Sequence, residues 1–323
     1  MEKNMNKINY LRLSVTDRCN LNCIYCNPAE KEKFLHKSEI LSYEEMARIT
    51  KIFSMLGVNK VRITGGEPLI KKEIVKFVGM LRDIKAIDEI SMTTNGTHLK
   101  KLAKDLKHAG LDRINISLDT LQAERFEKIT GTDGFHDVWD GITASMEAGL
   151  SPTKLNVILM KGINDDEVDD FIDLTFRYPL IVRFIEYFPT NRRLKEYSGN
   201  TITNEKVKGV IINAYGELKE GRDVIGNGPA RYYQVNGAVG AVGFISSFSD
   251  NFCSACNRIR IDSSGMIYPC LFTKEGYAVR HLLKENVSDE VLLQFITGVI
   301  REKPLHNKKN ECEPKVEMSS VGG

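Results

Sequence analysis

Three cysteines stand close together near the start of the chain, in the spacing CxxxCxxC. They follow a segment expected to be a strand, so they lie in a loop at its carboxyl end, the edge where (β/α) proteins place active sites. Three thiolates can hold three irons of a [4Fe–4S] cluster and leave the fourth iron open. A zinc site normally takes four protein ligands, and no histidine lies near enough in sequence to complete one. Cys19, Cys23 and Cys26 are therefore predicted to bind an iron–sulfur cluster.

A second group of three cysteines lies near the other end of the chain. Cys253 and Cys256 form CxxC, and Cys270 follows after thirteen residues. A zinc ribbon would need a second CxxC, which is absent from the sequence around Cys270. The remaining thiol, Cys312, lies in a polar tail and is interpreted as a bystander. A second cluster with an open iron is the favoured hypothesis.

Arginines and lysines recur inside segments that read as apolar strands. Arg258 and Arg260 alternate with isoleucines directly after the second CxxC, so in a strand they point to one face. Arginine suits phosphate because its guanidinium group binds two oxygens at once. Each of these cations could instead form a salt bridge, but together they predict a triphosphate site. The other inward cations are Arg12, Lys60, Arg62, Lys154 and Arg183.

Short polar or glycine-rich sequences follow three of the expected strands. Gly65-Gly66-Glu67-Pro68 could let a ligand approach the backbone, and the 93–96 segment, TTNG, and the 117–119 segment, SLD, suit ribose, carboxylate or substrate contacts. Taken alone, these segments fit ordinary turns and helix N-caps equally well.

Strand-like and helix-like segments alternate through the first 190 residues. Most of the strand segments are apolar on both sides, as parallel strands buried on two faces would be. Glycines 57, 110 and 149 stand where helix C-caps belong. The pattern predicts an α/β protein with a parallel sheet, and periodicity alone leaves a (β/α) barrel and a doubly wound sheet open. The expected strands are residues 10–15, 60–64, 89–94, 113–118, 155–160 and 181–188, and the expected helices are 42–56, 72–84, 99–109, 137–148 and 165–176.

The pattern changes after residue 188. Short strands expected at 232–235, 241–245 and 258–261 are separated by turns, and two helices are expected around 278–284 and 289–299. A boundary near residue 200 divides the chain into residues 1–200 and residues 201–323.

Composition excludes several classes of protein. The 323 residues carry 45 basic and 43 acidic side chains, a net charge of +2, which argues against a bulk electrostatic grip on nucleic acid. No apolar run approaches a membrane span, and residues 1–9 do not resemble a signal peptide. We therefore expect a cytoplasmic protein with no membrane partner, in which the seven cysteines are not disulfides.

The CxxxCxxC motif with an aromatic residue, Tyr25, before its third cysteine resembles the signature of the radical S-adenosylmethionine (SAM) superfamily, and GGEP after the second strand resembles a further element of it. The resemblance implies a partial (β/α)6 barrel whose open iron is chelated by SAM, and a reduced cluster that cleaves SAM to a 5′-deoxyadenosyl radical. It also implies SAM contacts by Tyr25, Gly66, Ser117 and Phe188. Such chemistry belongs to the cofactor, and the protein supplies orientation and exclusion of solvent.

Within the superfamily, CxxCxRxR followed by a lone cysteine and the terminal MSSVGG resemble the GTP 3′,8-cyclase family, over nearly the whole chain. This resemblance implies conversion of GTP to (8S)-3′,8-cyclo-7,8-dihydroguanosine 5′-triphosphate, the first step of molybdenum cofactor biosynthesis. The second cluster, in a C-terminal α+β extension, would bind the guanine edge. Catalytic roles fall on Arg258, Arg260, Gly322 and Gly323, and the implied GTP contacts are Arg12, Arg62, Thr93, Lys154, Arg258, Ile259 and Arg260.

The chain departs from the family pattern at two places. Asn27 follows the third cysteine where members often have methionine, and the loop at residues 28–37 is shorter than in many members. Phe188 stands where many members place a methionine against adenine. Neither change touches a predicted cluster ligand.

The resemblance also implies partners. These are an electron donor and cyclic pyranopterin monophosphate synthase as recipient of the product, and a homodimer is compatible with it. Two alternatives stay open from the sequence: a radical SAM peptide-modifying enzyme with an auxiliary cluster, and a non-catalytic metal-binding protein.

Overall fold

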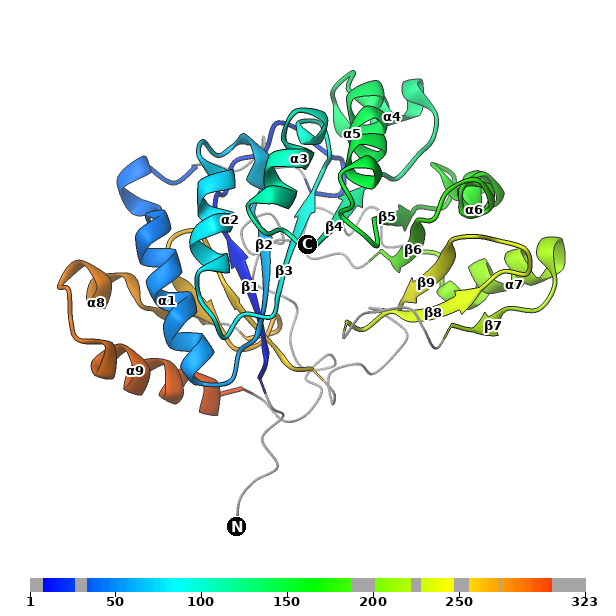
Figure 1. Cartoon of the computed structure of the whole chain (residues 1–323). Coiled ribbons are helices and arrows are strands. Elements are labelled where there is room, and N and C mark those ends of the chain that lie inside the picture. Colours follow the sequence, from blue (N-terminus) through cyan, green and yellow to red (C-terminus); the bar gives the residue numbers. More distant parts are fainter. Residues whose placement is uncertain are drawn as a thin grey trace, which may run out of the picture.

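The computed structural model describes residues 8–26, 34–187, 201–221, 228–246, 256–273 and 275–303. Within these residues the strands form a single curved sheet at the centre of the fold (Figure 1). Its centre is six parallel strands that lie side by side in the order in which they occur along the chain. They are β1 (Tyr10–Ser14), β2 (Lys60–Thr64), β3 (Glu89–Thr94), β4 (Arg113–Ser117), β5 (Lys154–Leu159) and β6 (Ile181–Glu186).

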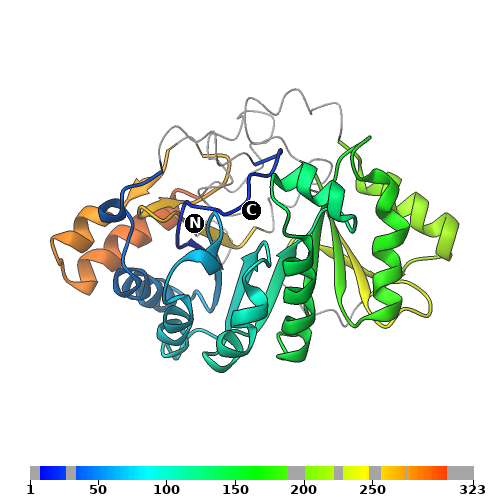
Figure 2. The same ribbon diagram turned by 90° about the horizontal axis from the view of Figure 1, so that it is seen from above.

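Helices connect these strands and lie along one face of the sheet, which we call the outer face (Figure 2). The five helices expected from the sequence begin and end close to the prediction, and glycines 57, 110 and 149 have the positive φ of a helix C-cap, as expected. The helices are α1 (Tyr43–Met55), α2 (Ile74–Arg82), α3 (Leu99–His108), α4 (Ala123–Thr130), α5 (Phe135–Glu147) and α6 (Val168–Arg177), and the short 3-10 helices are η2 (Lys37–Glu39), η3 (Pro68–Ile70) and η4 (Asp165–Glu167).

The strand order decides between the two architectures that periodicity left open. A doubly wound sheet reverses its strand order at a switch point, whereas β1 to β6 proceed in one direction without reversal. The expected (β/α)6 partial barrel is confirmed. No helix in the described part of the chain has the length and apolarity needed to cross a membrane.

The C-terminal strands extend this sheet at both edges. Strand β10 (Arg258–Ile261) pairs parallel with β1, and β9 (Ala241–Ile245) pairs parallel with β6. Antiparallel strands then continue outward on each side, which the sequence predicted only in part. They are β11 (Met266–Tyr268) and β12 (Tyr277–Ala278) beyond β10, and β8 (Arg231–Gln234) and β7 (Lys219–Glu220) beyond β9.

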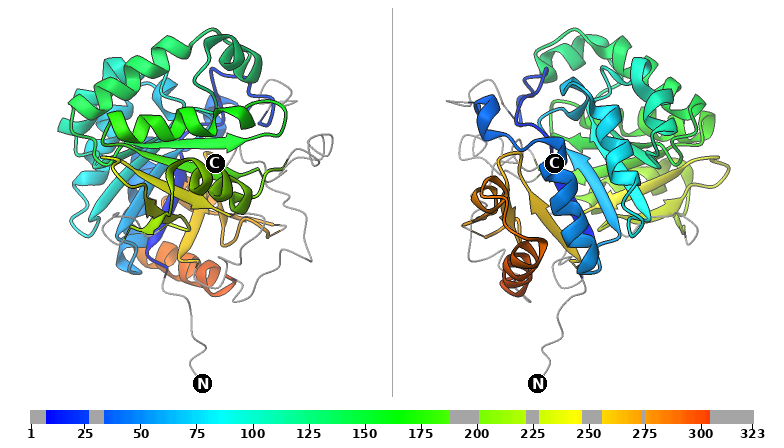
Figure 3. Two further views of the ribbon diagram at one scale, coloured as in Figure 1. Left: turned by 90° about the vertical axis from the view of Figure 1, so that its right-hand side faces the viewer. Right: turned by 60° about the vertical axis from the view of Figure 1, so that its left-hand side comes forward.

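In the described part of the C-terminal extension there are three helices. Helix α9 (Asp289–Arg301) lies beside α1, where Arg48 forms an ion pair of 2.9 Å with Asp289 (Figure 3). Helices α8 (Arg280–Lys284) and α9 were expected, whereas α7 (Asn204–Tyr215) and α4 were not.

The two faces of the sheet differ in polarity. Residues such as Leu11, Leu13, Val61 and Ile63 are completely buried in the core under the outer helices. Their neighbours along each strand, such as Arg12, point to the opposite face, which we call the inner face. The expectation that most strands are apolar on both sides was therefore wrong, because the inner face is lined by cations, amides and hydroxyls.

Candidate active site

The first cysteine group lies in a loop that follows β1 at the carboxyl edge of the sheet. Two backbone amides of this loop donate to carbonyls at the end of α4. The Asn22 amide donates to Thr130 over 2.8 Å, and the Ile24 amide donates to Ile129 over 2.9 Å. The last turn of α4 therefore fixes the middle of the loop that carries the three thiols.

Gly65 and Gly66 hold the start of the loop from the other side. The Gly66 amide donates to the Thr16 carbonyl over 2.8 Å, and a Cβ at Gly66 would lie 2.2 Å from the Arg18 carbonyl oxygen. Only a residue without a side chain tolerates that approach. The glycine pair was interpreted from sequence as room for a ligand, and here it gives room to the cysteine loop itself.

A tyrosine and an aspartate join the end of the loop to β4 and β5. The Tyr25 hydroxyl donates to a carboxylate oxygen of Asp119 over 2.6 Å, and the other oxygen accepts the Ile158 amide over 2.8 Å. Burial raises the pKa of Asp119 to about 6, although the two hydrogen bonds oppose the shift. Burial also raises the pKa of Tyr25, so its hydroxyl remains protonated and able to donate.

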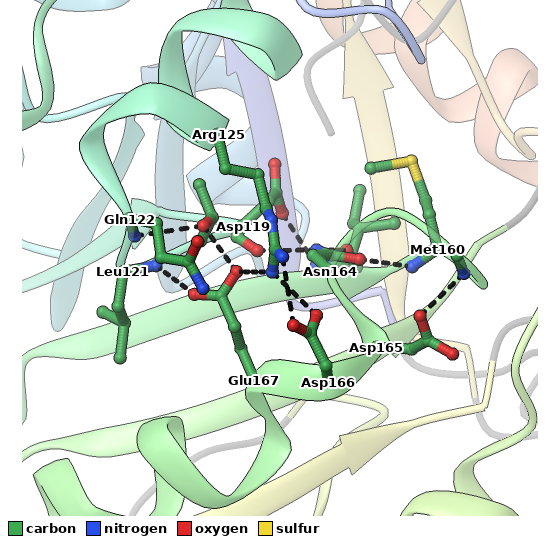
Figure 4. A network of polar contacts seen from close by, with 12 residues as sticks. Asp119, Leu121, Gln122, Arg125, Met160, Asn164, Asp165, Asp166 and Glu167 are labelled. Atoms are coloured by element: carbon green, nitrogen blue, oxygen red, sulfur yellow. Dashed lines mark hydrogen bonds and ion pairs between the residues drawn. The ribbon is translucent and has the colours of Figure 1, made fainter.

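Figure 4 shows how the network continues behind Asp119. Asn164 donates to the Asp119 carbonyl over 2.6 Å, and Arg125 of α4 lies between Asp166 and Glu167 of η4. Glu167 is fully buried and also accepts the Leu121 amide over 2.6 Å. The network thus ties α4, and with it the cysteine loop, to the loops after β4 and β5.

Glu67 of the GGEP segment links the ends of β2 and β3. Its buried carboxylate accepts bonds of 2.6 Å from the Thr94 hydroxyl and from the Asn95 amide. Burial raises the pKa of Glu67 to about 7 against the effect of these donors. Asn95 in turn donates to Asn20 over 2.9 Å and approaches the Cys19 sulfur at 3.9 Å. Glu67 therefore positions the first cysteine through Asn95.

The three thiols are partly buried. Burial raises the pKa of Cys23, and Asp119, Cys26 and Cys19 raise it further, so the three sulfurs lie close enough to affect one another. Within the described residues no three His, Cys, Asp or Glu side chains are arranged to hold one metal ion. A cubic cluster takes one thiolate for each protein-bound iron, and the anchored loop places three thiols close together.

The inner face of the sheet carries the predicted cations in adjacent rows. Arg12 is paired in register with Arg62 on one side and with Arg260 on the other. A second row runs through Thr93, Asn115 and Lys154. A third runs through Ser117, Asn156, Arg183, Gly243 and Tyr232.

These cations are crowded and withdrawn from water. Burial lowers the pKa of Arg12 well below its usual value, and Arg260 lowers it further. Burial likewise lowers the pKa of Arg260 to about 10 and that of Lys154 to about 8. Burial alone would raise the pKa of Tyr10, but Arg62, with Arg12 and Arg258, lowers it. Charge of this sign at this density favours an anionic ligand.

Several buried polar atoms on the inner face lack a hydrogen-bond partner among the described residues. They include Nε of Arg62, Oγ1 of Thr93, Nδ2 of Asn115 and Nε of Arg183. Buried donors without partners are costly, so their gathering in neighbouring rows fits a ligand rich in acceptor oxygens. A nucleoside triphosphate has that chemistry.

Two cysteines of the second group lie beside this face. Lys303, just beyond α9, donates to the Arg258 carbonyl over 2.6 Å and to the Pro269 carbonyl over 2.8 Å, and it approaches the Cys256 sulfur at 3.7 Å. Burial alone would raise the pKa of Cys256, but Arg258 and Lys303 lower it to about 7. Lys303 therefore joins the segments that carry Cys256 and Cys270, a role that no sequence pattern indicated.

The structure places the predicted site residues in different parts of the sheet. Arg12, Arg62, Thr93, Lys154, Arg258 and Arg260 lie on the inner face, and Tyr25, Gly66 and Ser117 lie at its carboxyl edge. The Ile259 side chain is buried on the outer face, so only its backbone can reach a ligand on the inner face. Phe188, Cys253, Cys312, Gly322 and Gly323 lie outside the described residues.

Two family profiles match the chain. Residues 13–175 match the one described as Radical SAM superfamily, and residues 180–309 match the one described as Molybdenum Cofactor Synthesis C. Among curated relatives, GTP 3′,8-cyclase of Heliobacterium modesticaldum is 43% identical over 320 residues, which cover 98% of each chain. GTP 3′,8-cyclase of Petrotoga mobilis is 41% identical over 324 residues, which cover 100% of each chain.

Solved structures show the same fold. Streptococcus suis SuiB bound to S-adenosylmethionine superposes with a TM-score of 0.64 at 16% identity, over 95% of this chain and 71% of that one. Methylornithine synthase superposes with a TM-score of 0.51 at 14% identity, over 64% of this chain and 62% of that one. Likeness at these identities concerns the fold alone.

Proposed function

The chain belongs to the radical SAM superfamily and, within it, to the GTP 3′,8-cyclase family, and on this premise we propose how its residues serve that reaction. The enzyme converts GTP to (8S)-3′,8-cyclo-7,8-dihydroguanosine 5′-triphosphate, the first step of molybdenum cofactor biosynthesis. SAM and an iron–sulfur cluster are its cofactors. When bound, they supply the 5′-deoxyadenosyl radical that removes the 3′ hydrogen atom of GTP.

The assignment of the substrate site rests on four inner-face side chains, Arg62, Thr93, Asn115 and Arg183, each of which has a buried polar atom without a hydrogen-bond partner among the described residues. We assign the phosphates of GTP to Arg12, Arg62, Thr93 and Lys154, because guanidinium, ammonium and hydroxyl groups all donate to phosphate oxygens. Arg12 and Arg62 are register partners on neighbouring strands, so both can contact the same triphosphate. Holding the nucleotide in one orientation fixes which hydrogen atom faces the carboxyl edge.

SAM is assigned to the carboxyl edge of the sheet, beside the cysteine loop. Tyr25 lies next to Cys26, Gly66 follows β2, and Ser117 ends β4, so all three border the same loop. Phe188, outside the described residues, is assigned to the adenine as in the sequence hypothesis. The Tyr25–Asp119 hydrogen bond holds this edge in place before any cofactor arrives.

A second [4Fe–4S] cluster is assigned to Cys253, Cys256 and Cys270. The proximity of Cys256 to Arg258 and Lys303 supports it, because cations stabilise the thiolate form that ligates iron. We propose that this cluster binds the guanine edge, and that Arg258 and Arg260, with the Ile259 backbone, orient the base. Gly322 and Gly323 are assigned to the same site through the C-terminal tail.

We propose that residues 1–200 supply the SAM half of the site and residues 201–323 the substrate and second-cluster half. Two partners complete the scheme. One is a protein or small molecule that donates electrons to the clusters, and the other is cyclic pyranopterin monophosphate synthase, which would receive the product. A homodimer is compatible with the same scheme.

Anaerobic incubation with GTP, SAM and a strong reductant tests the proposal. Formation of 5′-deoxyadenosine together with a cyclised guanine nucleotide is the expected result, and ATP in place of GTP serves as the control. If 5′-deoxyadenosine forms only with an added peptide, the chain is instead a peptide-modifying enzyme, the alternative left open by the sequence.

A further inference from the structure

Tyr232 is an inner-face residue that comes from the C-terminal extension. It lies on β8, and its register partner on β9 is Gly243, which is paired in turn with Arg183 on β6. Arg183 is paired with Asn156 on β5 and donates to its side-chain oxygen. The tyrosine therefore continues a row of polar side chains next to the row that contains Lys154.

Gly243 explains how a ring fits in this row. A Cβ at Gly243 would lie 2.9 Å from two ring carbons of Tyr232 and 3.1 Å from Cγ of Arg183. The tyrosine ring thus occupies the space that a side chain at Gly243 would fill. Because β9 leaves this gap, Tyr232 reaches across it toward β5.

At β5 the Tyr232 hydroxyl meets a lysine that the GTP assignment already uses. The Lys154 ammonium group donates to it over 3.0 Å and lies 4.8 Å from the ring centroid. Burial alone would raise the pKa of Tyr232, but Arg183 and Lys154 lower it. The hydroxyl therefore lies between two cations, one of which, Arg183, has a buried Nε without a partner among the described residues.

We propose that Tyr232 is a substrate-positioning residue, whose hydroxyl donates to a terminal phosphate of GTP held between Lys154 and Arg183. A hydroxyl can accept one hydrogen bond and donate another at the same time. Tyr232 can therefore accept the hydrogen bond from Lys154 while it donates one to a phosphate oxygen. A terminal phosphate has acceptor oxygens for the donors of Lys154, Arg183 and Tyr232. A nucleoside without phosphates has no acceptor at that position. This inference rests on the proposed function and adds a specificity contact to it.

The neighbouring tyrosine supplies a matched control. Tyr233 points to the other face of β8, where its ring packs edge-on against Phe244 at 5.6 Å and Lys208 lies 5.1 Å from the ring centroid. Both tyrosines are half-buried, and both lie beside one lysine. Replacing either by phenylalanine removes one hydroxyl at almost constant volume.

The test is equilibrium dialysis of the anaerobic holoenzyme with GTP and with GMP. For Tyr232→Phe we expect GTP affinity to fall about tenfold, or about 1.4 kcal/mol, because the variant loses a hydrogen bond to a charged phosphate. The GMP affinity of the same variant should change less than threefold. Its KM for GTP should rise, and its kcat should change less than its KM. The control variant Tyr233→Phe should match the wild type in all of these measurements. Unchanged GTP affinity in Tyr232→Phe, or an equal loss for GMP, would overturn the inference. Failure of the proposed function would look different, because the wild type itself would then not prefer GTP to ATP.

Discussion

The hydroxyl group of Tyr25 and the carboxylate of Asp119 form a 2.6 Å hydrogen bond across 94 positions of the chain. One partner lies inside the CxxxCxxC motif and the other follows β4. A residue known from its motif only as an aromatic is thus also an anchor for the loop. Mutation of Tyr25 to phenylalanine removes the hydroxyl and keeps the ring, so the role of the hydroxyl can be tested by itself.

Tyr25→Phe should destabilise the cluster-free protein by about 1–3 kcal/mol, because it leaves a buried carboxylate oxygen without its donor. Urea unfolding followed through Trp139, the single tryptophan, measures the change. Asp119→Asn should cost less, since its amide can donate to the Tyr25 hydroxyl while its oxygen keeps the Ile158 amide. Equal stability of Tyr25→Phe and the wild type would contradict the anchoring role.

Gly66→Ala should displace the cysteine loop. The new Cβ would lie 2.2 Å from the Arg18 carbonyl oxygen and 3.0 Å from the Cys19 amide, and both are backbone atoms that no rotamer change can move. We expect loss of most of the iron bound by the first cluster, measured after anaerobic reconstitution.

Gly79→Ala is the matched control for that variant. Nothing lies within 4 Å of a Cβ at Gly79, which is in α2, so alanine should raise helix stability by up to about 1 kcal/mol and leave iron content unchanged. Full iron content in Gly66→Ala would show that the loop can relax away from the glycine.

Sequence reasoning located the parts of the site whose residue type carries the chemistry. The described cysteines, the paired glycines and the inner-face arginines were found because thiols bind iron and because cations are rare inside apolar strands. Period-two alternation also placed Arg258 and Arg260 on one face, and their register partners on β1, Tyr10 and Arg12, confirm it.

What the sequence could not supply were contacts between distant segments. Tyr232 looks like any strand tyrosine in the sequence, and only the fold shows that its hydroxyl accepts a hydrogen bond from Lys154, 78 positions away. Lys303 looks like a helix-end lysine until it is seen bridging two carbonyls beside Cys256. Helix α4 was missed because it is only eight residues long and largely charged, so tertiary contacts such as the Arg125 ion pairs hold it.

Cys270→Ala should lower the iron content from about eight to about four atoms per chain, because it removes a ligand of the second cluster only. Cys23→Ala should give a similar loss from the first cluster, and the double variant should bind almost none. Cys312→Ala, which changes the thiol assigned to neither group, should retain full iron. Retention of all iron in Cys270→Ala, measured with acid-labile sulfide, would remove this residue from the cluster.

Deletion of Gly322 and Gly323 should abolish formation of the cyclised nucleotide while leaving iron content and the unfolding midpoint unchanged. Paired glycines can enter a narrow site that other residues cannot, and removing two terminal residues leaves the described core intact. Product formation is measured by anaerobic turnover with GTP. Wild-type turnover by the truncated enzyme would exclude the tail from the site.

GTP affinity should fall as pH rises from 7 to 9, because the pKa of Lys154 in the free protein is lowered to about 8, chiefly by burial. Phosphate binds the protonated ammonium form of Lys154. The fraction of protein with Lys154 protonated falls as pH rises above this pKa, to roughly one tenth at pH 9. Lys154→Arg keeps its charge throughout this range and should bind GTP with little pH dependence. Lys154→Met should bind weakly at every pH. Equilibrium dialysis with GTP between pH 7 and 9 measures these affinities. If GTP affinity fell as steeply with pH in Lys154→Arg as in the wild type, the titrating group would not be Lys154.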